Sequence, residues 1–167
     1  QTPHNALATE IAHAAGLRAH ALLTLCPVAE RAADPRPALD SKWKGRSGEI
    51  YTVQGKGGLT REVMIPHELA ARLEERRLDA PQVVTDRGVF YQSSYDIGGG
   101  QRWSNSVSAA SERTMGRSTG AHGLRHSYAQ ERMTELQNRG LSRDAALETV
   151  SQEMGHFRPE ITETYLR

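Results

Sequence analysis

The chain has 167 residues, of which 25% are charged and 5% aromatic, and its formal net charge is +1. This length allows one domain with a substantial core, and the composition excludes a disordered chain. No run of about 18 apolar residues and no secretory signal is present, which predicts a cytoplasmic protein without a membrane span. The single Cys26 excludes an internal disulfide framework and a cysteine-rich zinc site. Because the chain begins with Gln1, we expect it to be part of a longer protein.

Basic residues are spread unevenly along the chain. Five basic residues and one glutamate lie between Lys42 and Arg61, and seven arginines and three glutamates lie between Gln101 and Arg143. Phosphate binding depends on local positive surface and not on the total charge. The two stretches are therefore candidates for nucleic-acid contacts, with ordinary solvated surface charge as the alternative.

The first 37 residues combine apolar helical patterns with a loop. Apolar residues recur at helical spacing from residue 5 to residue 25, and Gly16 can end or bend this helix. Leu17 to Leu25 then predicts a second, apolar helix. Three of the seven prolines lie between Pro27 and Pro37, which predicts a loop.

A β-hairpin is predicted in the middle of the chain. Glu49–Gln54 and Leu59–Ile65 both alternate strand-forming residues, and the glycine-rich Gly55–Gly58 separates them. Lys56 falls between glycines at the tip of this hairpin.

The next segment mixes weaker signals. Residues 67–77 alternate charged and apolar positions, which predicts a short amphipathic helix. Residues 83–84 and Val89–Tyr91 predict short strands. Three consecutive glycines at 98–100 lack the spacing of a nucleotide-binding loop, so they predict a flexible connection.

The last third of the chain is predicted to be helical. One helix covers Gln101–Met115, and a second runs from a Thr119 cap to about Asn138. Ser142 caps a third helix that Gly155 ends, and Pro159 suits the first turn of a final short helix. Together the elements predict an α+β fold that is mainly α-helical with a small antiparallel β-sheet.

Several side chains could support phosphodiester transfer, which needs a nucleophile, cations for the non-bridging oxygens and an acid for the leaving oxygen. Tyr165 is the candidate nucleophile, although a lone tyrosine packed at a helix end is the usual alternative. His122 and Arg125 lie three residues apart, so they share a helix face. The arginine fork matches a phosphate, and the histidine can relay a proton.

Other candidates have ordinary alternatives. His122 and His126 have the spacing of a zinc-binding pair, but Gly123 stands where a zinc protease carries its glutamate and a third ligand is lacking, so we predict no metal site. Lys56 could be a solvated turn lysine. His156 could be a capping histidine at a helix end.

The order of four motifs resembles one family. Gly16–Leu23 looks like the first arginine motif of the tyrosine recombinases, the phage integrase family, and Gln54–Arg61 looks like their hairpin lysine motif. His122–Ala129 is similar to their histidine–arginine box, and Gly155-His156 followed by Tyr165 is similar to their second histidine and nucleophile. One detail departs from the family pattern: Ala21 occupies a place where an acidic residue often follows the arginine.

The resemblance implies that residues 1–167 form a C-terminal catalytic domain without the N-terminal DNA-clamping domain. It implies a site-specific recombinase, such as the integrase of a phage or mobile element, that cuts and rejoins DNA strands through a 3′-phosphotyrosyl intermediate without a cofactor. The site residues that it implies are Arg18, Lys56, His122, Arg125, His156 and Tyr165.

Partners and alternatives follow from the same resemblance. The expected partner is double-stranded DNA in the bacterial cytoplasm, bound by a homotetramer of the full-length protein, whereas the isolated fragment is expected to be a monomer. Two alternatives stay open: a DNA-binding relative that has lost turnover, and a type IB topoisomerase that religates the same strand. The missing acid after Arg18 keeps the first of these open.

Overall fold

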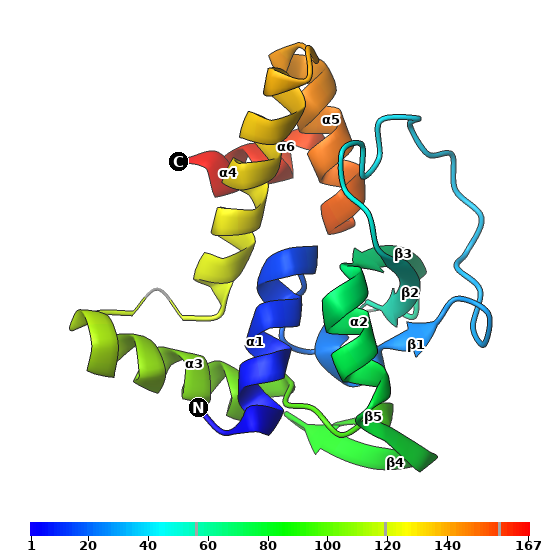
Figure 1. Cartoon of the computed structure of the whole chain (residues 1–167), viewed down its shortest axis with the longest axis vertical. Coiled ribbons are helices and arrows are strands. Elements are labelled where there is room, and N and C mark those ends of the chain that lie inside the picture. Colours follow the sequence, from blue (N-terminus) through cyan, green and yellow to red (C-terminus); the bar gives the residue numbers. More distant parts are fainter. Residues whose placement is uncertain (56, 119, 157) are drawn as a thin grey trace.

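The computed structural model describes residues 1–55, 57–118, 120–156 and 158–167. About half of the chain is helical, with six α-helices in the described part, and two small antiparallel sheets accompany them (Figure 1). The predicted α+β class is therefore confirmed. No helix in these ranges is both long and apolar enough to cross a membrane.

Helix α1, Pro3–Ala15, ends at Gly16 as predicted, since Gly16 has a left-handed φ of 67°. A side chain there would also collide with the Tyr128 ring, which lies 2.8 Å from the position of a Cβ. The predicted second helix over Leu17–Leu25 is wrong: only Ala21–Thr24 form a single 3-10 turn, η1. The apolar run is buried from several sides and leads straight into a strand, so it lacks the one-sided pattern of a helix.

The first sheet has the order β1-β2-β3, with β1 at Cys26–Pro27, β2 at Glu49–Gln54 and β3 at Thr60–Ile65. Strands β2 and β3 pair antiparallel from Glu49↔Ile65 to Gln54↔Thr60, which confirms the predicted hairpin. Lys56, at its tip, lies outside the described residues.

A second hairpin is formed by β4, Arg77–Asp86, and β5, Val89–Tyr95. The short strands predicted here are real but longer than expected. Most of β4 is exposed, so its sequence lacks the polar–apolar alternation that marks a strand packed on one face.

Five further α-helices follow much of the prediction. Helix α5 begins after Ser142, whose Oγ accepts a hydrogen bond from the Ala145 N–H at 3.1 Å, and ends at Gly155 with a φ of 79°. Ala121 holds the N-cap position of α4, and the predicted cap Thr119 lies outside the described residues. The helices are α2 at His67–Glu74, α3 at Gly100–Met115, α4 at His122–Asn138, α5 at Arg143–Met154 and α6 at Pro159–Glu163, followed by a 3-10 turn, η2, at Thr164–Leu166.

Buried apolar side chains form two clusters. One joins α1, α2, α3 and the first sheet, and the other joins α4, α5 and η2. Figure 1 shows this division, with α4, α5 and α6 at the top of the molecule and α1 to α3 below them. Helix α4 contacts α1, so the ends of α1, α4 and α5 meet where the two clusters join.

Candidate functional site

Tyr165 lies in η2 with only 5% of its surface exposed. Three imidazole rings surround it: the ring centroids of His122, His126 and His156 lie 5.0, 4.9 and 5.4 Å from that of Tyr165. The Arg125 guanidinium carbon lies 5.4 Å from the same ring centroid. Four of the six predicted site residues therefore meet at one point.

Arg125 is 1% exposed and connects three helix ends. Its Nη1 donates to the carbonyl of Gly16, and its Nη2 donates to the carbonyl of Met154 at 3.3 Å and to His156 Nε2 at 3.0 Å. Its Nε is buried and has no acceptor among the residues that the structure describes. Since a buried donor without an acceptor costs free energy, this guanidinium is suited to an additional oxygen ligand.

His156 is buried directly after α5, and its neighbours define its protonation. Because arginine can only donate, the His156 Nε2 that faces Arg125 must be an acceptor. The proton is then on Nδ1, which donates to Thr162 Oγ1 at 2.7 Å. Burial, together with the positive charges of Arg125 and other nearby arginines, lowers the pKa of His156 to about 4. This histidine is therefore neutral in the free protein.

His122 and His126 occupy the first turns of α4. His122 is exposed on one side, and its pKa is lowered by burial of the rest of the ring and by the nearby charges of His126 and Arg125. The ring centroids of His122 and His126 are 5.3 Å apart. Within the described ranges, no three histidine, cysteine or carboxylate side chains are grouped so that they could hold a metal ion.

Arg18 lies just after α1, on the exposed side of the site. Its charge contributes to the lowered pKa values of His122 and His156, which shows that it is close to both. The Arg18 side chain makes no hydrogen bond or ion pair with any described residue, although the backbone carbonyl of Arg18 accepts from the Ala21 N–H at 3.0 Å. Ala21, at the place of the family's acidic residue, is buried, while the ring of His20 stacks on Tyr91.

Arg61, on β3, also borders the candidate site, although the sequence placed it only in the basic stretch 42–61 and at the end of the hairpin motif. Its Nη1 donates to the Glu153 carbonyl at 3.0 Å. Burial, together with the charges of Arg125 and Arg18, lowers the pKa of Arg61 to about 9. An arginine on a strand normally indicates a solvent-facing position, so the sequence assigned it no individual role at the site.

The end of α5 is held by a buried carboxylate. Arg132 and Glu153 are 0% and 1% exposed and bind each other through two hydrogen bonds of 2.8 Å. Glu153 also accepts from the Tyr128 hydroxyl at 2.6 Å and from the Trp43 N–H at 2.8 Å. Because Glu153 lies three residues before His156, this network fixes the end of α5 and, with it, the position of His156. Arg132 is thus a structural residue and contributes nothing to the basic surface that the sequence indicated for residues 101–143.

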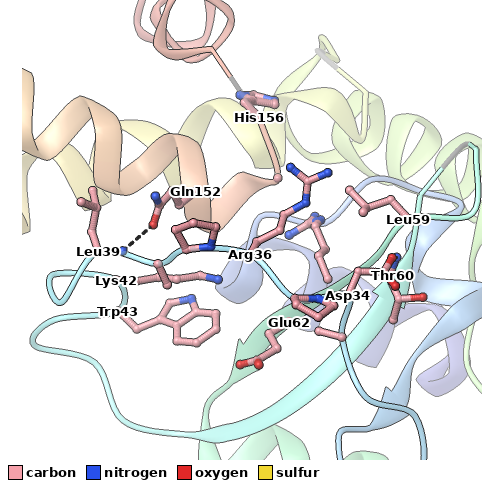
Figure 2. A pocket seen from close by; sticks show the side chains of 16 residues that line it. Asp34, Arg36, Leu39, Lys42, Trp43, Leu59, Thr60, Glu62, Gln152 and His156 are labelled. Carbon is pink, nitrogen blue, oxygen red and sulfur yellow. Dashed lines mark hydrogen bonds between the residues drawn. The ribbon is translucent and has the colours of Figure 1, made fainter.

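A cavity of about 660 Å³ lies beside His156. Arg36, Lys42 and Trp43, from the loop before β2, line it together with residues of β3. Figure 2 shows the Arg36 guanidinium directed away from β3, and it shows that Gln152 accepts from the Leu39 N–H, at 2.9 Å. The long loop over residues 28–48 is therefore part of the surroundings of the site.

Gly155→Ala should destabilise the fold more than Gly88→Ala. The two glycines have φ values of 79° and 78°, so the cost of a left-handed alanine, about 1–2 kcal/mol, is the same in both. A Cβ at Gly155 would lie 2.5 Å from Arg61 Nε, whereas nothing lies within 4 Å at Gly88. Urea unfolding of both variants measures the difference. If both variants lose the same free energy of unfolding, the Arg61 side chain moves away from the new Cβ without cost.

The sequence matches no protein-family model, and no curated protein matches it at a significant level. The functional interpretation therefore depends on the motifs and on the arrangement of the side chains.

Proposed function

We propose that this chain is the catalytic domain of a tyrosine recombinase, which cuts and rejoins DNA strands through a 3′-phosphotyrosyl intermediate. One observation carries the proposal: His122, Arg125 and His156, selected by motif from distant parts of the sequence, surround the candidate nucleophile Tyr165. A packed tyrosine at a helix end would need no such collection of arginine and histidine. Arg18 and Arg61 add positive charge without a carboxylate partner among the described residues.

In the first half of the proposed reaction, the Tyr165 oxygen attacks a DNA phosphorus atom. The new phosphorus–oxygen bond replaces the bond to the 5′ oxygen of the next nucleotide. His122 accepts the phenol proton, which its lowered pKa favours because the imidazole is neutral at pH 7. The resemblance assigns Lys56 as the donor of the proton that the departing 5′ oxygen takes up.

The arginines stabilise the charge on the phosphorane directly, and His156 contributes by accepting from Arg125 and so fixing the position of its guanidinium. Arg125 and Arg18 donate to non-bridging oxygens, for which planar guanidinium groups are well matched. A 5′-hydroxyl from a partner strand then attacks the phosphotyrosyl phosphorus, and Tyr165 leaves with its proton restored. The covalent link keeps the bond energy, so the cycle consumes no nucleotide.

The test is covalent trapping on DNA of unknown sequence. The chain is incubated with nicked duplexes that carry a degenerate central region and lose a short 5′-hydroxyl fragment after cleavage. Adducts that resist denaturant are recovered, their DNA is sequenced, and the modified residue is mapped by mass spectrometry. We expect one enriched sequence and a nucleotide adduct on Tyr165. Reversible binding without any adduct would contradict the enzyme and favour the DNA-binding relative, and relaxation of plasmids that carry the site without exchange would indicate a topoisomerase.

The pH dependence of stability should report the buried His156. Its pKa is about 4 in the folded chain against 6.5 for the free side chain, so the unfolded state binds more protons between these values. The contribution of the neutral histidine to the free energy of unfolding is therefore fully present above pH 6.5, and it is lost as the pH falls towards 4. The loss is on the order of 3 kcal/mol. Urea unfolding at several pH values should show a smaller loss for His156→Gln than for the wild type. Identical profiles would contradict the neutral, buried state.

DNA is the proposed partner, and the full-length protein is proposed to act as a homotetramer that pairs two duplexes. Arg102, Arg113 and Arg117, on and just after α3, are exposed and offer phosphate contacts away from the reacting centre. The chain alone is expected to be monomeric, and its DNA affinity is expected to fall steeply as salt rises.

A further inference from the structure

Arg61 lines a small cavity near the turn end of the β2–β3 hairpin, where it pairs with Val53. The cavity has a volume of about 160 Å³ and is bordered by Arg18, Gln54 and Gly155 as well as by Arg61. This volume is several times the roughly 30 Å³ that one water occupies in the liquid, so a tetrahedral oxyanion fits. Among the described residues around the cavity there is no aspartate or glutamate.

Two guanidinium groups therefore face one space without a carboxylate to neutralise them. Arg61 is held in place because its Nη1 donates to the Glu153 carbonyl at 3.0 Å, a bond that leaves its other donors for a ligand. The depressed pKa of Arg61 reflects burial and repulsion by Arg125 and Arg18, which an anion in the cavity would relieve. Gly155 keeps the space open, because a Cβ there would meet the Arg61 side chain.

The geometry points to Arg61 as a further phosphate-binding residue, which binds a DNA phosphate together with Arg18. This inference rests on the proposed function, because it names a residue and a ligand group for the same site. The cavity lies between the hairpin and the end of α5, next to Gly155 and therefore next to His156. A phosphate bound there is the reacting phosphate or its immediate neighbour in the strand.

The test follows the arginine side chains by NMR in a Tyr165→Phe background, where covalent chemistry does not occur. Inorganic phosphate and, separately, a mixed-sequence duplex are added to the protein labelled with nitrogen-15. The Arg61 Nε–H signal, assigned by its loss in Arg61→Lys, should shift saturably with both probes. A shift with phosphate but not with DNA would assign a free-anion site and overturn the inference, as would a signal that neither probe moves.

DNA affinity gives an independent measurement. Arg61→Met should weaken binding at least fivefold and reduce the slope of log affinity against log salt by about 0.9, the value for one lost phosphate contact. Arg61→Lys keeps the charge, so its slope should stay unchanged while its affinity falls. The matched control is Arg72→Met on α2, an exposed arginine that pairs with Glu10, and its affinity should change less than twofold.

The outcomes separate this inference from the proposed function. If Arg61→Met does not fold, the DNA affinity of Arg61→Lys and the NMR shift still test whether Arg61 binds phosphate. If Arg61→Lys and Arg72→Met both bind DNA as tightly as the parent protein does, the phosphate-binding role of Arg61 is overturned. This holds even if Tyr165 forms an adduct. Conversely, a saturable Arg61 shift without any Tyr165 adduct supports the phosphate site and contradicts the enzyme.

Discussion

Tyr165→Phe is expected to abolish the covalent DNA adduct while the affinity for DNA stays within about twofold of the wild type. The substitution removes the one oxygen that can form the new bond to phosphorus. The ring itself keeps its place among His122, His126 and His156, so the arginines that we propose bind phosphate are unchanged. The measurement is adduct formation on the trapped sequence, alongside equilibrium binding to an intact duplex.

A matched tyrosine separates chemistry from general damage. Tyr91, on β5, stacks on His20 and lies outside the group around Arg125. Tyr91→Phe should form the adduct at the wild-type rate. If Tyr165→Phe still forms an adduct, the assignment of Tyr165 as the nucleophile is wrong, whichever residue carries the DNA.

Glu153→Gln is expected to lower the free energy of unfolding by about 3–5 kcal/mol, the usual cost of removing one partner of a buried ion pair. The reason is that Arg132, which is 0% exposed, would lose its buried carboxylate and keep only the partly exposed Glu135, whose Oε2 accepts from Arg132 Nη1 at 2.8 Å. A glutamine fills the same volume, so loss of packing does not explain the effect. Urea or thermal unfolding measures it directly.

An exposed pair provides the control. Arg143 and Glu163 are paired at the surface, with side chains 52% and 34% exposed, so Glu163→Gln should leave the free energy of unfolding almost unchanged. A double variant, Arg132→Met with Glu153→Leu, removes both buried charges and should recover part of the loss. Recovery is incomplete because the Tyr128 hydroxyl and the Trp43 N–H lose their acceptor. A cost below about 1 kcal/mol for Glu153→Gln would contradict this prediction and show that Glu135 alone is a sufficient partner for Arg132.

The buried Glu153 pair also lies next to the residues that we propose bind phosphate. His156 follows Glu153 by three residues, and Arg125 donates to the intervening Met154 carbonyl. A folded Glu153 variant should therefore bind DNA phosphate less well although none of the proposed ligand groups is altered.

The sequence alone determined the local elements whose signals are short-range. The hairpin of β2 and β3 follows from alternating residues around four consecutive turn-forming positions, and the ends of α5 follow from Ser142 and Gly155. It also selected His122, Arg125, His156 and Tyr165, because their motifs depend on residue type and order. Local propensity decides such features before any long-range contact forms.

The tertiary structure decided what depends on partners distant in the chain. Leu17–Leu25 forms only one 3-10 turn, because its apolar residues are buried from several directions and its end must pair with β2. Arg61 and Glu153 look like surface residues in the sequence. They are drawn into the site because β3 packs against the end of α5, and because a carboxylate can be buried only where Arg132 and Tyr128 supply its hydrogen bonds. Burial and charge at such positions are properties of the assembled fold, which no local pattern encodes.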